Sequence, residues 1–359
     1  MAGFAPGAHF ETANVRNLLA AHGVEASEAM CLGVGGGIAA GYQFCPSVPN
    51  YGADLGSGVQ MIPRVKLMTT NGAWYVDTFA RLGVGTDMRE ATGKKAAAGN
   101  LEAGLATGKP VVAWTTPLGL AMTHNWTATC GMYTVLVHGV AGERVSYSDH
   151  ISVRTVGLEE FTAARARVCS LKNRTMTVKV KGKLDWKGAA LAGLAETVQD
   201  FAKPRLGTFN LPGLKEGVGL VNGRKNKKAW PVVFPGEKVL GPMRDMFESI
   251  EVGTGGGLMR PLYADFLDEA AKLTGKKGLG RVAGTYRKLG VAWTEFAEFL
   301  LPFPELRAAL RRPGSSLPVV RLGWDERETA LFLDEVSRRM GGLYEAELAA
   351  AAELTGAVG

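Results

Sequence analysis

Apolar residues recur at helical spacing near the start of the chain. Val15, Leu18 and Leu19 fall on one face of a helix, and Gly23 follows as a residue that ends helices. A second helix is expected up to residue 30, before the glycine-rich run of residues 33–41. The sequence therefore predicts a helix, a turn and a second helix at the N-terminus.

Strand-like patterns occupy the middle of the chain. Four short runs of apolar and β-branched residues predict strands: residues 110–114, 133–138, 144–147 and 174–181. The two central runs are joined by the glycine-bearing residues 139–142 and predict a β-hairpin. Residues 42–64 are rich in proline and glycine and predict irregular structure.

Helical periodicity returns in the last third of the chain. Amphipathic patterns cover residues 258–273 and 289–300, and a long pattern covers residues 325–354, with Asp325 as its expected N-cap. Residues 1–185 are therefore predicted to form an α+β domain, with helices first and an antiparallel sheet after. Residues 186–359 are predicted to form a mixed, mainly helical C-terminal domain.

Basic residues are concentrated in one segment of the chain. The 359 residues carry a net charge of +7, and residues 172–228 hold 13 Lys and Arg against four acidic residues. Such a segment attracts an acidic partner at long range, either an acyl carrier protein or a phosphorylated small molecule. Nucleic acid is not expected, because aromatic residues are sparse there and no reader motif accompanies them. The plainer interpretation is a solvated basic loop.

Composition excludes several classes of protein. No apolar stretch reaches the length of a membrane span, and no secretory signal pattern is visible. The four cysteines show no metal-ligand spacing, and the five scattered histidines form no clear metal set. We therefore expect a cytoplasmic protein without disulfides, and no metal cofactor is indicated.

Candidate chemistry is concentrated in two places, a motif at His9–Leu19 and the predicted hairpin. In papain-like folds a cysteine begins the first central helix, where the helix dipole and a nearby imidazole lower its pKa. The histidine begins a strand, and an Asp or Asn on a following strand orients its ring. Here the corresponding stretches are His9-Phe10-Glu11-Thr12, Tyr133–Gly139 and Ser148-Asp149.

These residues resemble the butirosin biosynthesis protein H family. The N-terminal motif leads into Arg16-Asn-Leu-Leu and the run Gly33–Gly37, and a C-terminal domain resembling the family's second domain follows, with Gly253–Leu258 near its start. The resemblance implies a papain-like fold and acyl transfer from a carrier-protein thioester to an amine. It also places Phe10 at the nucleophile position, Tyr133 at the general-base position and Asp149 at the orienting acid.

Phenylalanine has no nucleophilic atom, so a covalent mechanism at position 10 is excluded. One hypothesis is a cysteine-independent acyltransferase or thioester- or amide-processing enzyme of specialised metabolism. It would use His9 as base, Tyr133 as oxyanion donor, and Glu11 and Asp149 beside them. The alternative is a pseudoenzyme that keeps the cleft for a ligand or partner. The least favoured hypothesis is a new reaction on the same scaffold, with a cofactor bound in the cleft.

Further residues are candidates for binding substrate. Phe10, Arg16, Gly35 and Gly36 belong to the N-terminal motif and its glycine-rich turn, and Cys130 is a candidate relocated nucleophile, with a packed thiol as the plainer interpretation. Gly255 and Gly256 lie directly before a predicted helix, where bare backbone N–H groups suit a phosphate of phosphopantetheine or coenzyme A, with Arg260 as a further contact. The plainer interpretation of this glycine run is tight packing of the second domain on the first. A small amine is the expected acceptor, and homodimerisation stays open.

Overall fold

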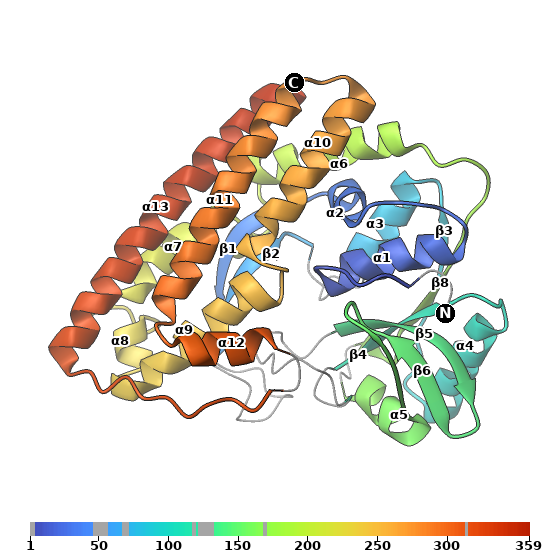
Figure 1. Cartoon of the computed structure of the whole chain (residues 1–359), viewed down its shortest axis with the longest axis horizontal. Coiled ribbons are helices and arrows are strands. Elements are labelled where there is room, and N and C mark those ends of the chain that lie inside the picture. The colour runs from blue at the N-terminus through green and yellow to red at the C-terminus, as the bar shows by residue number, and fades with distance from the viewer. Residues whose placement is uncertain are drawn as a thin grey trace. The chain divides into compact units, whose positions relative to one another are not determined.

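The computed structural model describes most of the chain and divides it into two compact units (Figure 1). The described residues are 4–45, 57–66, 72–116, 120, 133–167, 171–312 and 315–359. Among them, the first unit holds residues up to 36 and most of residues 66–193, and the second holds residues 37–65 and 194–359. The sequence predicts a single boundary at residue 185, whereas residues 37–65 pack with the second unit.

The first unit combines helices with an antiparallel sheet. Its sheet has six strands in the order β3-β8-β4-β5-β6-β7, and every neighbouring pair is antiparallel. The β5–β6 hairpin lies where the sequence predicts it. The elements are α1 (Phe10–Ala21), α2 (Glu28–Gly35), α3 (Ala73–Arg81), β3 (Gly85–Arg89), α4 (Lys94–Leu105), β4 (Val111–Thr115), β5 (Tyr133–Ala141), β6 (Arg144–Ser148), β7 (Val153–Gly157), α5 (Leu158–Ala166) and β8 (Thr175–Lys179).

Helix α1 packs on strand β5 through apolar and polar contacts. The side-chain amide of Asn14 donates to the carbonyl oxygen of Thr134 at 2.9 Å, and the hydroxyl groups of Tyr75 and Thr134 lie 2.7 Å apart. All three side chains are buried, so these bonds satisfy polar groups that would otherwise be costly to bury. The contact fixes the register between the start of α1 and the start of β5.

The second unit is mainly helical, with one two-stranded sheet. Helices α10 and α13 both pack against α11, as Figure 1 shows. Helix α6 (Trp186–Ala202) carries the chain from the first unit into the second. The other elements are β1 (Ile38–Phe44), β2 (Val59–Arg64), η3 (Gly207–Phe209), α7 (Leu211–Val221), α8 (Trp230–Val233), η4 (Gly236–Val239), α9 (Leu240–Phe247), η5 (Glu248–Val252), η6 (Gly257–Met259), α10 (Arg260–Thr274), α11 (Gly278–Leu300), α12 (Pro304–Arg311) and α13 (Glu326–Val358).

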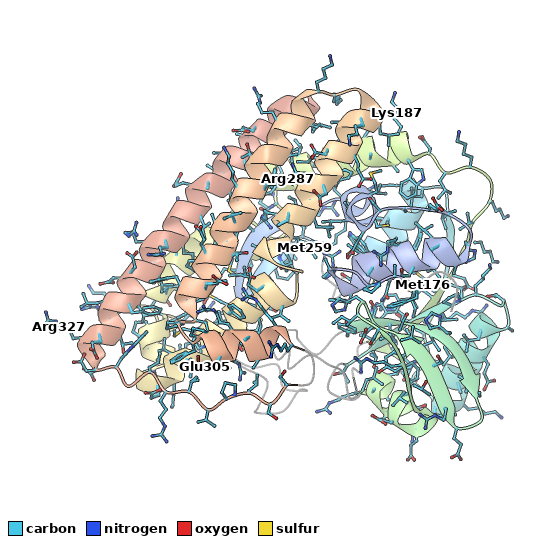
Figure 2. All side chains as sticks on the ribbon, in the orientation of Figure 1. Met176, Lys187, Met259, Arg287, Glu305 and Arg327 are labelled. Atoms are coloured by element: carbon cyan, nitrogen blue, oxygen red, sulfur yellow. The ribbon has the colours of Figure 1, made fainter. Side chains whose placement is uncertain are left out.

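The predicted fold class is confirmed: the chain is α+β, with an antiparallel sheet in its N-terminal part and a mainly helical C-terminal part. Asp325 is the N-cap of α13, in a capping box with Glu328. The irregular structure predicted for residues 42–64 is wrong at both ends, because β1 and β2 pair there. Figure 2 labels two buried methionines, Met176 in β8 and Met259 beside α10. Among the described residues, no helix has the length and apolar content of a membrane span.

A buried ion pair joins helices α10 and α13 inside the second unit. The Nε atom of Arg260 lies 2.8 Å from Oε1 of Glu347, and the indole N–H of Trp293 donates to the same oxygen at 2.6 Å. The Arg260 guanidinium also donates to the carbonyl oxygens of Leu258 and Ala39. Both charged side chains are fully buried, so removing either one would leave the other charge buried without its partner.

This network predicts a large loss of stability in Glu347→Ala. Because the variant leaves the Arg260 charge buried without its partner, we expect the free energy of unfolding to fall by about 3–5 kcal/mol, measured by urea denaturation. The matched control Glu345→Ala, at an exposed position of the same helix, should change it by less than about 0.5 kcal/mol. Equal stability of the two variants would contradict the assignment.

Candidate functional site

The first residues of α1 and β5 meet in the first unit. Phe10 begins the helix and Tyr133 begins the strand, and their rings stack with centroids 4.4 Å apart and planes at 26°. Phe10 is 4% exposed and Tyr133 is 1% exposed. The positions that the resemblance assigns to nucleophile and base are therefore adjacent, as a papain-like site requires, but they hold an aromatic pair.

The phenol of Tyr133 is held in its protonated form. Burial raises its pKa well above 10, and the negative charge of Asp149 raises it further. A buried phenol of this kind can donate a hydrogen bond, but it cannot act as a base near neutral pH. Tyr133 thus does not replace a histidine in function.

The hydroxyl of Tyr133 is bonded to His150. The oxygen lies 2.5 Å from Nδ1 of the imidazole, and His150 is itself buried. The phenol, being protonated, is the donor when the imidazole is neutral. The sequence predicts Asp149, and not His150, as the residue that orients Tyr133. No spacing signal marks His150, since its role depends on a contact across the β5–β6 hairpin.

Asp149 orders the turn that follows β6. Its Oδ1 atom accepts hydrogen bonds from the backbone N–H groups of Ile151 and Ser152, each at 2.7 Å, and its Oδ2 atom pairs with Nε of Arg154 at 3.0 Å. The carboxylate is fully buried and already has three donors. Its direct bonds therefore hold the turn, and its negative charge helps to raise the pKa of Tyr133.

A carboxylate outside the predicted site residues anchors the start of α1. Glu28, the first residue of α2, accepts hydrogen bonds from the backbone N–H groups of Ala8 and His9, each at 2.9 Å, and from the hydroxyl of Thr12 at 2.7 Å. A negative charge at this end of a helix is also favoured by the helix dipole. Glu28 therefore fixes the segment that carries His9 and Phe10. From the sequence, only the position of Glu28 near the start of a helix could be predicted.

His9 and Glu11 flank Phe10 as expected, and both are buried. The His9 ring packs against the Phe10 ring, with centroids 4.4 Å apart and planes at 44°. His9 is the N-cap residue of α1, but its side chain makes no capping bond to the first turn. Glu11 lies in that first turn and is 1% exposed. The two predicted catalytic side chains thus lie beside Phe10 and are almost completely shielded from solvent.

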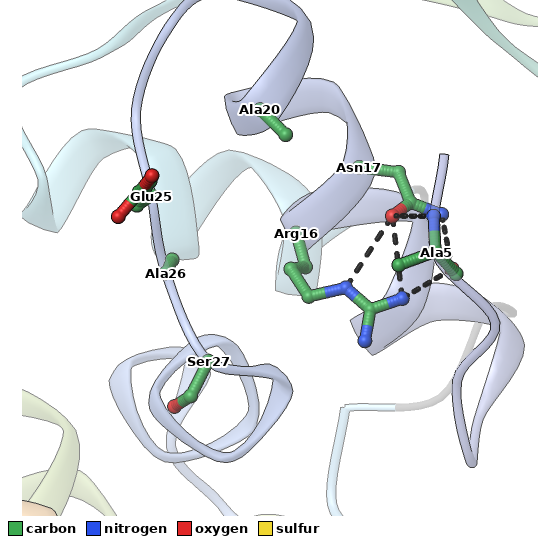
Figure 3. Close-up of a pocket in the computed structure, with 7 residues that line it drawn as sticks. All are labelled: Ala5, Arg16, Asn17, Ala20, Glu25, Ala26 and Ser27. Carbon is green, nitrogen blue, oxygen red and sulfur yellow. Dashed lines mark hydrogen bonds between the residues drawn. The ribbon is translucent and has the colours of Figure 1, made fainter. Parts of the chain in front are cut away.

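Arg16 lines a pocket of about 520 Å³ beside α1, shown in Figure 3. Its guanidinium donates to the carbonyl oxygens of Ala5 and Pro6 and lies 3.6 Å from a Glu28 oxygen. The side-chain oxygen of Asn17 accepts from Arg16 as well, at 3.2 Å. Arg16 therefore ties the N-terminal segment to α1 while it forms part of an open surface pocket.

Packing and backbone geometry explain why glycines stand at the end of α2. A Cβ atom on Gly35 would lie 2.0 Å from Nε1 of Trp74, so no side chain fits there. Gly36 has φ 70° and ψ 177°, a conformation that only glycine adopts readily. The predicted role of both in binding substrate stays a prediction.

The second glycine run belongs to the second unit. Gly255 and Gly256 have positive φ angles of 74° and 99°, and the next N–H group, of Gly257, donates to a carboxylate oxygen of Glu251 at 3.1 Å. The Arg260 guanidinium is used by the buried ion pair described above. This geometry favours a turn and a packing role over the predicted phosphate site. Cys130 lies outside the described residues.

Within the described part of the chain, no cluster of three or more His, Cys, Asp or Glu side chains is suited to hold a metal ion. Comparison with protein families gives two matches. Residues 9–150 match the family model described as Butirosin biosynthesis protein H, N-terminal, and residues 157–308 match a domain of unknown function, DUF4872. No curated protein matches the chain.

The anchoring of α1 by Glu28 is testable by stability measurements. Glu28→Ala removes the acceptor of three hydrogen bonds and leaves buried donors unsatisfied, so we expect the free energy of unfolding to fall by about 2–3 kcal/mol in urea titrations. Glu25→Ala, at an exposed position three residues earlier, is the matched control and should stay within about 0.5 kcal/mol of the parent protein. Parent-like stability of Glu28→Ala would show that the segment holds without this carboxylate.

Proposed function

Because the chain belongs to the butirosin biosynthesis protein H family, we propose that it is a catalytically inactive member of that family, which retains the scaffold for binding. The family gives the N-terminal part an enzyme-like domain of specialised metabolism. The observation that carries the proposal is the stacked, buried pair of Phe10 and Tyr133, which stands at the positions that the resemblance assigns to nucleophile and base.

The aromatic pair does not meet the requirements of a thiol mechanism. Phe10 offers no atom that could form an acyl-enzyme, and Tyr133 keeps its proton because burial raises its pKa. An aromatic stack also fills the volume in which a thioester carbonyl would have to approach the helix N-terminus. Acyl transfer at this position therefore lacks the nucleophile, the base and the space.

Binding could instead use surfaces outside the filled slot. The pocket beside Arg16 is open and lies on the helix that Phe10 begins. In the proposed role, a carrier protein or coenzyme A thioester would be a bound partner rather than a reacting donor. The exposed basic residues 224–228 are the surface best suited to attract an acidic partner of this kind.

A second candidate function is direct, cysteine-independent acyl transfer. The hydrogen bond between Tyr133 and His150 favours it, because a phenol–imidazole pair can pass a proton to or from a reacting group. In this mechanism Tyr133 would stabilise the oxyanion and the imidazoles of His150 and His9 would take the amine proton. The burial of all three side chains is the observation against it.

Mass spectrometry with thioesters separates the two candidates. The purified chain is incubated with acyl-pantetheine and acyl-coenzyme A thioesters and a mixture of amines, and free thiol and amide product are counted. We expect no turnover above the buffer control. Turnover that falls at least about tenfold in His150→Gln or His9→Ala would overturn the proposal and favour direct transfer.

Rebuilding the lost pair tests whether positions 10 and 133 are the inherited nucleophile and base. We expect the thiol of the double variant Phe10→Cys/Tyr133→His to react with iodoacetamide at pH 6 at least about tenfold faster than that of Phe10→Cys alone, because only the double variant has an adjacent imidazole that lowers the thiol pKa. Rates are measured by mass spectrometry on folded protein. Equal rates in the two variants would show that the two positions do not form such a pair.

A further inference from the structure

A second cavity, of about 280 Å³, lies in the second unit beside the N-terminus of α13. Three segments line it: the residues that follow α7, the stretch from α8 to Gly236, and Trp324 and Asp325 with the first turns of α13. No residue of the candidate site takes part. Its volume is near the lower end of the range for small-molecule sites, about 300–1,000 Å³.

One side of the cavity is aromatic and held in place by its neighbours. The Phe234 ring packs edge-on against Trp230, at 6.5 Å between centroids, and against Phe44, at 5.7 Å. The Trp324 ring lies 4.7 Å from the Phe332 ring. The wall is therefore formed before any ligand arrives, and it suits an apolar or aromatic group.

Hydrogen bonds also fix the backbone that carries this wall. A carboxylate oxygen of Glu237 accepts from the N–H of Leu322 at 3.0 Å and the other accepts from Gly323 at 2.9 Å, and the two bonds lower the pKa of Glu237. The capping box of Asp325 and Glu328 uses donors at the start of α13. An anion in the cavity is therefore expected to depend on a side chain rather than on the helix N-terminus.

The lining carries charges of both signs. Arg224 contributes a guanidinium and Glu326 a carboxylate, and neither forms an ion pair with another residue in the described ranges. Asp325 and Asp334 bring the carboxylates to three: an oxygen of Asp325 accepts from the backbone N–H of Glu328, and Oδ1 of Asp334 accepts from the side-chain amide of Asn222 at 3.0 Å. A simple anion or a simple cation would satisfy only one of the two signs. A zwitterion satisfies both.

We propose that this cavity binds a free amino acid with an apolar or aromatic side chain. Arg224 pairs with the α-carboxylate, which a guanidinium can hold through two parallel hydrogen bonds. Glu326 and Asp334 receive the α-ammonium group. The ligand's side chain lies against the rings of Phe234 and Trp324, and a side chain of phenylalanine size suits the volume.

Calorimetric titration of the full chain tests the proposal with three probes. L-phenylalanine carries both charges, phenethylamine lacks the carboxylate and 3-phenylpropionate lacks the ammonium group. We expect L-phenylalanine to bind at least about tenfold more tightly than either analogue. The proposal is overturned if no L-amino acid gives binding heat at millimolar concentration, or if one single-charge analogue binds as tightly as L-phenylalanine.

Charge-specific variants locate the binding. Arg224→Gln should weaken L-phenylalanine at least about tenfold and leave phenethylamine unchanged, whereas Glu326→Gln should weaken phenethylamine and leave 3-phenylpropionate unchanged. Arg327→Gln is the matched control: Arg327 is exposed near the same end of α13 and does not line the cavity (Figure 2). Equal effects of Arg224→Gln and Arg327→Gln would overturn the assigned site.

Discussion

The buried amide of Asn14 is the contact on which the candidate site depends. It donates to the carbonyl oxygen of Thr134, and its neighbour Tyr75 bonds the hydroxyl of the same threonine. These polar groups have no access to water, so the helix and the strand can meet only in the register that satisfies them. That register places position 10, one helical turn before Asn14, against position 133. The juxtaposition is thus a property of the scaffold, and it persists whichever side chains stand there.

The polar groups around this contact now serve the fold. Glu28 holds the segment before α1, and Asp149 holds the turn after β6 through bonds to backbone N–H groups. In a thiol site the positive end of the helix would favour a thiolate. Here a fixed carboxylate already stands at that end, and a thiolate beside it would meet like charge.

The elements that short-range interactions determine were predictable from the sequence. The helices, the β5–β6 hairpin and the cap at Asp325 follow from periodicity, turn glycines and a capping residue. The strands of residues 38–44 and 59–64 were missed, because glycine and proline weaken their strand pattern in the sequence. These strands are instead stabilised by the pairing of β1 with β2. His150 and Glu28 were missed because long-range contacts define their roles. The meeting of positions 10 and 133 was visible only through the family resemblance.

In the proposed function an aromatic pair stands at the positions that the resemblance assigns to a reactive pair, and the two kinds of pair differ in what they gain from burial. A thiolate and an imidazolium need water or precise pairing, because burying charge is costly. Two stacked rings gain from exclusion of water, and their geometry adds about 0.5–1.5 kcal/mol beyond the buried area. At these two positions an aromatic pair is therefore easier to bury than a charged pair. In the proposed function, recognition relies on charged groups outside this pair, and the pockets beside Arg16 and Arg224 offer such groups.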